Sequence, residues 1–282
     1  ASGHASLYTN TTGSQNTANG AGALQYNTTG AGNTATGVAS LANNITGINN
    51  TAIGGYSLFN TTTGHFNTAS GVGSLYANTS GLENAAVGVN ALNKNTIGNY
   101  SVAIGAWSLY NNTGSNNTAL GHSALYSNTT GTGNMALGKA LYANTTGANN
   151  TGIGELAGYA NTIGTGNVFI GRSAGFWEAG SNKLYISNNP TTPLLYGVFS
   201  GTAANNKLGI GTITIPAGNT IAVWNGARLT TGGVWTNASS RELKENIQTL
   251  SAGDANQALA ALSPVRYVYK NSRDEEYVGF IA

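Results

Sequence analysis

Charge is scarce in this chain. Only 7% of its 282 residues are Asp, Glu, Lys or Arg, against about 25% in an ordinary soluble domain. Cysteine is absent, which excludes disulfide bonds and thiolate metal sites. No apolar run approaches the roughly 18 residues of a membrane-spanning helix, so no membrane insertion is predicted for this segment. The net charge of +2 argues against nucleic acid as a partner, because such binding needs a clustered basic face.

The few charged residues are distributed unevenly. The last 44 residues carry eleven of them, whereas residues 1–171 carry only four: Glu83, Lys94, Lys139 and Glu155. The shift predicts a domain boundary near Ser239, with a repeat rod over 1–171, a β-rich neck or shaft over 172–238 and a C-terminal domain over 239–282.

The carboxylates of the rod, Glu83 and Glu155, are too far apart in the repeat to form an enzyme site. Sugar-cleaving enzymes pair two carboxylates about 5–9 Å apart, whereas these two lie several repeats apart. We therefore predict no glycoside-hydrolase site on the rod, and no cofactor or metal site anywhere in the chain.

The chain contains a repeat of 16 or 17 residues. It is clearest over 117–133 and has the pattern N-T-A-x-G-x-x-x-L-x-x-N-T-T-G-x-x. This period is too short for paired-helix repeats, which need about 33 residues, and Gly, Asn and Thr are poor helix formers. The repeat predicts an all-β parallel solenoid with two short strands and two turns per coil. One strand ends at the first glycine, and the Asn-Thr-Thr-Gly turn uses a glycine with positive φ.

Stacked coils place equivalent residues in columns about 4.8 Å apart. An asparagine column is expected to form amide ladders, a leucine column to form a thin core, and an aromatic column to pack against the next coil or the next chain. Stacked rings that bind sugars are the alternative for the aromatic column. Because one coil cannot bury its own apolar face, we expect chains to associate. The asparagines are Asn16, Asn33, Asn50, Asn67, Asn84, Asn117, Asn134, Asn150 and Asn167; the leucines are Leu7, Leu24, Leu41, Leu58, Leu75, Leu92, Leu109, Leu125 and Leu141; the aromatics are Tyr8, Phe59, Tyr76, Tyr110, Tyr126 and Tyr142.

Two resemblances concern the rod and the neck. The sequence S-V-A-I-G at 101–105 resembles the core of the head repeat of trimeric autotransporter adhesins, which form a three-chain β-roll from shorter repeats. Strands are predicted at 183–187, 194–199 and 212–215 from β-branched and aromatic residues between turn signals. This neck resembles the shaft segments of tail-fibre proteins.

The C-terminal segment carries the most specific motif. Residues 239–247, S-S-R-E-L-K-E-N-I, resemble the opening S-D-x-x-L-K-x-N-I of the intramolecular chaperone domain of endosialidases and phage tail fibres, peptidase family S74. A predicted helix over 254–262, the sequence S-P-V-R-Y-V-Y and a final G-F-I-A follow in the family's order. The chain stops where the family's remaining helices begin, so we expect a truncated α+β domain. Ser240 departs from the family's Asp.

The resemblance implies a self-cleaving site. In that family the chaperone folds and trimerises the fibre and then cuts itself off before the motif serine. Carried over, the scissile bond is Ala238–Ser239, the nucleophile is Ser239 and its partner is Lys244. The alternative is an uncut domain with a solvated lysine.

The function expected from these observations is structural. We predict an extracellular homotrimeric fibre, on a virion tail or a bacterial surface or injection system, that attaches to a cell-surface receptor or glycan and is held by a baseplate or anchoring protein. Self-cleavage would be its only enzymatic act. An autotransporter-type adhesin head is the alternative, and an ice-binding solenoid with regular threonine columns is a weaker one.

Overall fold

The computed structural model describes residues 1–236, 251–254, 265–269 and 272–279. The chain forms two units, Ala1–Thr236 and Asn237–Ala282. The first contains strands β1 to β16 and a single 3₁₀ turn, η1 (Ala203–Asn205), and the second contains β17 and β18. The predicted all-β class is confirmed.

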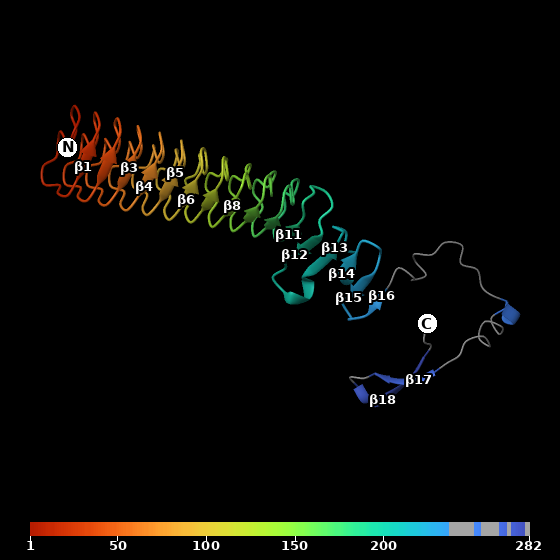
Figure 1. The fold of residues 1–282 in the computed structure, drawn as a ribbon. Coiled ribbons are helices and arrows are strands. Elements are labelled where there is room, and N and C mark those ends of the chain that lie inside the picture. The colour runs from red at the N-terminus through yellow and green to blue at the C-terminus, as the bar shows by residue number, and fades with distance from the viewer. Residues whose placement is uncertain (237–250, 255–264, 270–271, 280–282) are drawn as a thin grey trace. The chain divides into compact units, whose positions relative to one another are not determined.

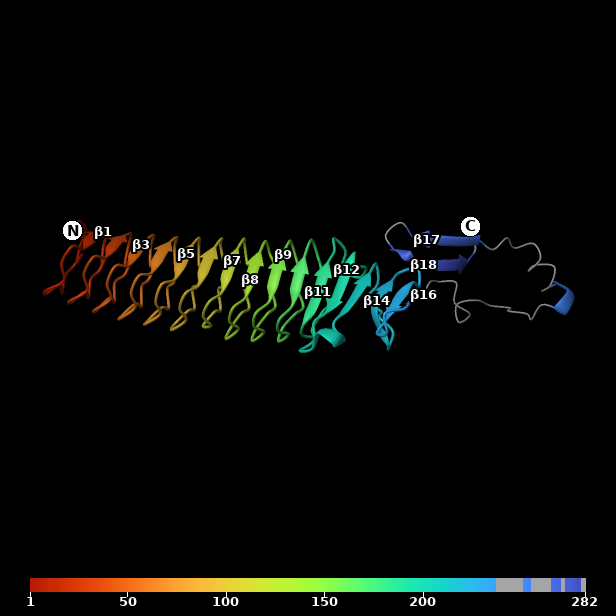
Figure 2. The ribbon, with the colours of Figure 1, turned by 90° about the horizontal axis from the view of Figure 1, so that it is seen from below.

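The rod is built from ten short parallel strands, one from each coil (Figures 1 and 2). Each has three residues and pairs in register with the next, so that Ala18 lies opposite Ala35, and Ala35 opposite Ala52. The predicted parallel β-solenoid of 16–17-residue coils is therefore confirmed. The strands are β1 (Thr17–Asn19), β2 (Thr34–Thr36), β3 (Thr51–Ile53), β4 (Thr68–Ser70), β5 (Ala85–Val87), β6 (Val102–Ile104), β7 (Thr118–Leu120), β8 (Met135–Leu137), β9 (Thr151–Ile153) and β10 (Val168–Ile170).

The prediction of a second strand in each coil is wrong. The segment after the first glycine is a series of turns. Leu24 has a φ of 50°, and its N–H donates to the carbonyl of Ser40 in the next coil, whereas the Ala23 N–H donates to Gly20 within its own coil. Because the hydrogen bonds alternate between the same coil and the next coil, this segment forms turns and does not pair with the next coil as a β-strand.

The glycine of the Asn-Thr-Thr-Gly turn has a different role from the one predicted. Gly30 does not have a positive φ. A Cβ there would clash with the carbonyl oxygen of Gly47 and lie 2.5 Å from Asn27 Oδ1, so glycine is required by the close approach of successive coils. Positive φ is found instead at the first glycine of the repeat, for example 132° at Gly37.

The core is a column of leucines facing a column of strand alanines. The leucines from Leu24 to Leu141 are fully buried, as are nearly all the alanines at the centres of the strands. Gly158 interrupts the leucine column, and Phe169 takes the central position of β10. The Phe169 ring lies where a Cβ on Gly158 would be. One large ring therefore replaces the missing leucine.

The predicted asparagine column is present, but its ladder differs from a simple amide stack. Asn50 N donates to Asn33 Oδ1 at 2.9 Å, and Asn67 N donates to Asn50 Oδ1 at 2.9 Å. The side-chain Nδ2 of Asn50 donates to the carbonyl of Gly64 at 2.8 Å. Each buried amide thus forms hydrogen bonds with backbone groups of the adjacent coil. Some asparagines of the column also bond directly to each other, such as Asn67 Nδ2 to Asn50 Oδ1 at 3.1 Å.

A second asparagine column, which the sequence reasoning missed, lies at the start of the Asn-Thr-Thr-Gly turns. Here the amides bond directly, with Asn27 Nδ2 to Asn10 Oδ1 at 2.7 Å and Asn44 Nδ2 to Asn27 Oδ1 at 2.6 Å. Thr61 occupies this position in the next coil. Asn44 Oδ1 is accordingly buried without a hydrogen-bond partner among the described residues.

The neck continues the sheet of the rod, which has sixteen strands in all. The strands predicted at 183–187 and 194–199 are confirmed. The strand predicted at 212–215 is wrong, because Thr214 N donates to Thr212 Oγ1 at 3.0 Å in a local turn. The neck strands are β11 (Lys183–Ile186), β12 (Leu195–Val198), β13 (Lys207–Ile210), β14 (Asn219–Val223), β15 (Arg228–Thr230) and β16 (Trp235–Thr236).

The second unit is described in part. β17 (Val265–Tyr269) and β18 (Ser272–Gly279) form an antiparallel pair in which Val265 lies opposite Gly279. This hairpin falls on the S-P-V-R-Y-V-Y motif and reaches the glycine of the final G-F-I-A. Residues 252–254 are helical, whereas the rest of the predicted 254–262 helix lies outside the described residues.

Replacing Thr61 with asparagine should stabilise the rod. The new Nδ2 would donate to Asn44 Oδ1, an unsatisfied buried group whose cost is about 1–3 kcal/mol, so we expect the free energy of unfolding to rise by about 1 kcal/mol in chemical denaturation. The reciprocal control is Asn128→Thr, which removes the 2.7 Å bond to Asn112 Oδ1 and should destabilise the rod by a similar amount. A Thr61→Asn variant less stable than the wild type would contradict the ladder argument.

Candidate functional site

The residues predicted to carry self-cleavage lie outside the part of the chain that the structure describes. They are Ser239, Lys244 and the Ala238–Ser239 bond. Their roles stay predictions from the resemblance. The candidate sites on the described residues are therefore features of the rod and neck.

Ser251 is the first described residue after the predicted cleavage motif, and its side chain makes hydrogen bonds. Its Oγ donates to Asp254 Oδ2 at 2.6 Å and accepts from the Asp254 backbone N–H at 3.1 Å. A serine that accepts from the N–H three residues later is an N-cap. The helical turn predicted to begin at Asp254 therefore begins earlier, directly after Ser251.

The aromatic column is a continuous stack of rings over the C-terminal half of the rod. Neighbouring centroids lie 4.9–5.5 Å apart, and the planes are within 12° of parallel. The predicted packing against the next coil is confirmed for five of the six predicted rings, and the column extends two residues beyond the predicted set. Tyr8 is the exception, because it is 75% exposed and makes no ring contact among the described residues. The stack consists of Tyr110, Tyr126, Tyr142, Tyr159 and Phe176; Phe59 and Tyr76 form a separate pair.

The ring faces of this column are covered by protein. Each inner ring has an aromatic neighbour on both faces, Lys94 Nζ lies 5.0 Å from the Tyr110 centroid, and Lys139 Nζ lies 4.9 Å from that of Tyr142. Sugars stack on exposed aromatic faces, whereas these rings present edges and hydroxyl groups to solvent. The geometry favours a structural role, in which each ring pair adds about 0.5–1.5 kcal/mol beyond its buried area.

A hollow of about 300 Å³ lies where the rod meets the neck, lined in part by Trp177, Glu178 and Tyr185. The Tyr185 hydroxyl donates to Glu178 Oε2 at 2.7 Å, and Gly180 N donates to Glu178 Oε1 at 2.7 Å. Burial, and then the hydrogen bond to the Glu178 carboxylate, raise the pKa of Tyr185 well above its usual range. The residues lining the hollow include a single carboxylate, and both its oxygens are engaged, so the hollow has no second carboxylate to form the pair that a glycoside hydrolase uses.

The threonines of the Asn-Thr-Thr-Gly turns use their hydroxyl groups within the rod. Thr28 Oγ1 donates to the carbonyl of Ile45 at 2.9 Å, and Thr129 Oγ1 donates to that of Thr145 at 3.0 Å. A hydroxyl bonded to the next coil is less available to order water. This geometry weakens the argument for an ice-binding face at the turns.

The residues that the structure describes contain no group of three or more His, Cys, Asp or Glu side chains placed to hold a metal ion. None of their helices has the length and apolar character needed to cross a bilayer.

Comparison with known proteins identifies the C-terminal segment. Residues 239–282 match the family described as the chaperone of endosialidase, as the S-S-R-E-L-K-E-N-I motif predicted. Searches of curated proteins and of solved structures gave no match. A β-solenoid followed by a segment of this family fits a tail-fibre-like protein.

Tyr126→Leu should destabilise the rod, because it removes two stacked ring pairs while keeping an apolar side chain. We expect a loss of about 1–3 kcal/mol in the free energy of unfolding. Tyr126→Phe keeps both pairs and is the control, with a change within about 0.5 kcal/mol. Equal stability of the two variants in a denaturation series would show that stacking adds nothing.

Proposed function

We propose that this chain belongs to a homotrimeric fibre that attaches to a cell surface, and that residues 239–282 begin the chaperone that assembles it. The observation that carries the proposal is the match of residues 239–282 to the chaperone of endosialidase. The fibre is a phage tail fibre or a related fibre of a bacterial surface or injection system.

The rod suits a part that provides reach outside the cell. Its coils are held by hydrogen bonds from each coil to the next and by a core one leucine and one alanine thick. Stability of such a solenoid comes from stacking many similar units. A long, stiff and nearly uncharged rod spans distance without offering a catalytic cleft. Its partners would be a cell-surface receptor or glycan at one end and a baseplate or anchoring protein at the other.

Self-cleavage would separate the finished fibre from its chaperone. Lys244, as a neutral amine, takes the proton of the Ser239 hydroxyl, and Oγ attacks the carbonyl carbon of Ala238. The Ala238–Ser239 C–N bond breaks as the nitrogen takes a proton, which leaves an ester between Ala238 and Ser239 Oγ. Water hydrolyses the ester and gives a carboxylate on Ala238 and a free hydroxyl on Ser239. Burial of the lysine would lower its pKa enough for this role.

Intact mass spectrometry of the natural full-length protein tests the cleavage. The wild type should yield a fragment that ends at Ala238, and Ser239→Ala should remain uncut, because the nucleophile is gone. Lys244→Ala should be cut at least 100-fold more slowly, in line with the usual contribution of a general base.

Ser240→Ala is the matched control and should be cut like the wild type, since the family spacing to Lys244 starts at Ser239. An uncut wild type would contradict the roles proposed for Ser239 and Lys244. It would not contradict the trimeric fibre, which light scattering tests separately. Light scattering that gives the mass of a single chain would overturn the trimer.

A further inference from the structure

The outer face of the sixteen-stranded sheet carries an unbroken column of aliphatic side chains. In ten consecutive strands, β5 to β14, the residues paired at one register position are all Val, Ile or Leu. We call this set the aliphatic column. It consists of Val87, Ile104, Leu120, Leu137, Ile153, Ile170, Ile186, Leu195, Ile210 and Val223.

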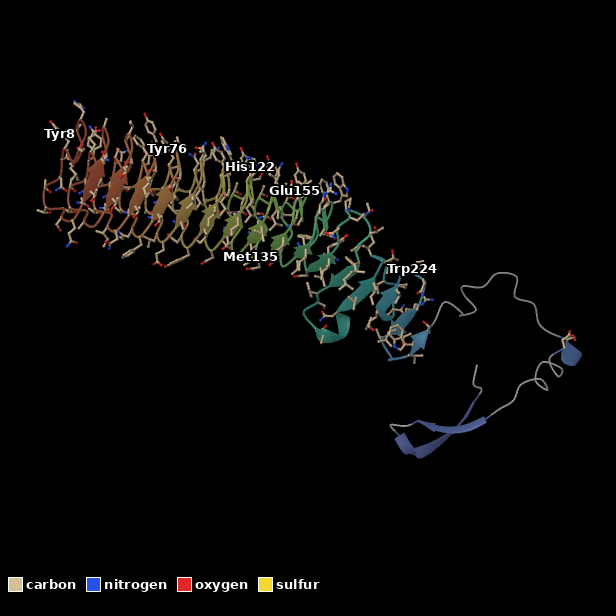
Figure 3. The ribbon with its side chains drawn as sticks, viewed as in Figure 1. Tyr8, Tyr76, His122, Met135, Glu155 and Trp224 are labelled. Atoms are coloured by element: carbon tan, nitrogen blue, oxygen red, sulfur yellow. The ribbon has the colours of Figure 1, made fainter. Side chains whose placement is uncertain are left out.

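The aliphatic column faces away from the core. Ala103 and Ala119, at the centres of β6 and β7, are fully buried, whereas Ile104 is 44% exposed and Leu137 is 47% exposed. Side chains alternate between the two faces of a strand, so the column and the residues two positions before it share the outer face. Met135, in that second column, is 49% exposed and lies on the opposite edge of the rod from Tyr76 and His122 (Figure 3).

The two outward-facing columns of β5 to β14 are also free of charge. The second column includes no Asp, Glu, Lys or Arg; its residue lies two positions before the aliphatic column in each strand except the antiparallel β12, where it lies two positions after. The largest apolar patch on a typical monomer covers about 300–600 Å² and is often functional, which makes this strip a candidate interaction surface. The paired positions are Ala85, Val102, Thr118, Met135, Thr151, Val168, Leu184, Gly197, Leu208 and Ile221.

The strip is long and narrow. Ten strands spaced about 4.8 Å apart span about 43 Å, and three residues cover about 10 Å along a strand, which gives each chain a strip of about 430 Å². A stable interface between two chains buries about 800 Å² on each partner, so the strip would form only part of the contact between chains in a trimer.

The spacing of the column indicates which partner covers it. A partner must present apolar groups at the same interval over ten consecutive strands. It must not bring polar groups to the column, because the aliphatic side chains cannot form hydrogen bonds with them. A second copy of this chain, parallel and at the same height, meets that condition at every step, because its own aliphatic column has the same interval. A glycan or a charged receptor does not meet that condition, because its polar or charged groups would lie against aliphatic side chains. Within the first four coils the position holds Asn19, Thr36, Ile53 and Ser70, so the apolar contact begins at β5.

We propose that the aliphatic column is the surface on which three copies of the chain meet around a common axis. The proposal rests on the trimeric fibre proposed above and adds the face that forms its interface. The aromatic column then lies on the outside of the trimer, where receptor or solvent can reach its edges.

Cysteine cross-linking tests the face directly, because the natural chain has no cysteine. Leu120→Cys places one thiol in the aliphatic column. Ser127→Cys, in the same coil but next to Tyr126 of the aromatic column, is the matched control. Each full chain is treated with a short bismaleimide, and its products are separated under denaturing conditions, while light scattering measures the mass of the untreated protein.

The expected result is the mass of three chains for both variants, with at least tenfold more cross-linked product for Leu120→Cys. Trimers that cross-link at Ser127→Cys instead would overturn the proposed face and leave the fibre intact. The mass of one chain would overturn both the trimer and this interface. Trimers in which Leu120→Cys neither cross-links nor reacts with a monofunctional maleimide would show that another segment or partner covers the column, and would also overturn the proposal.

A charge variant gives a second, independent readout. Leu120→Asp should lower the trimer fraction at micromolar concentration at least tenfold, since it would bring three carboxylates together on an apolar axis. Ser127→Asp adds the same charge on the other side and should leave the fraction unchanged. Equal trimer fractions for the two variants would count against the interface.

Discussion

Buried asparagine side chains are the constraint on which the rest of the rod depends. A coil of 16 or 17 residues turns its backbone sharply at several places, and every turn leaves N–H and C=O groups that a strand ladder cannot satisfy. A buried polar group without a partner is costly. The amide of Asn50 supplies both a donor, to Gly64 O, and an acceptor, for Asn67 N. Few side chains of that size can both donate and accept a hydrogen bond. This explains why asparagine occupies the column at every step from Asn16 to Asn167 except one, where Ser101 supplies a hydroxyl group.

The same constraint sets the other features of the repeat. Since Asn27 donates to the carbonyl of Gly30 and the next coil approaches closely there, no Cβ fits at Gly30. Stacking also explains the scarcity of charge, because equal charges in one column would repeat at about 4.8 Å and repel strongly at that distance. The one-residue shortening of the Asn112-Thr113-Gly114 turn falls outside the strands, so the sheet register continues from Ile104 to Leu120.

Periodicity was enough to predict the architecture, since a strict repeat of 16 or 17 residues with glycine and asparagine in fixed columns admits few folds. It predicted the Leu24–Leu141 core and the strand that ends at the first glycine. It did not predict the left-handed φ of Leu24, because leucine rarely adopts that conformation unless burial of its side chain compensates. It also missed Tyr159 and Phe176, because each follows a glycine, Gly158 or Gly175, where the earlier coils have the leucine that marks the column. Ser239 and Lys244 came from a resemblance, and no periodicity could have found them.

The rod therefore has hydrogen-bonded amides inside each coil and aliphatic side chains on its outer face. Polar amides inside each coil fix the conformation of one chain, and that conformation places Ile104 and its counterparts outward at a constant interval. If the interior were apolar throughout, the coil could collapse into several packings, and the outer column would lose its register. In the trimer proposed above, the specificity of the fold would lie inside the coil, in its buried asparagines, and the driving force for assembly would lie in the aliphatic column on its surface. The match of residues 239–282 to a chaperone family supports that proposal, because parallel columns would have to be brought to the same height before they could pack.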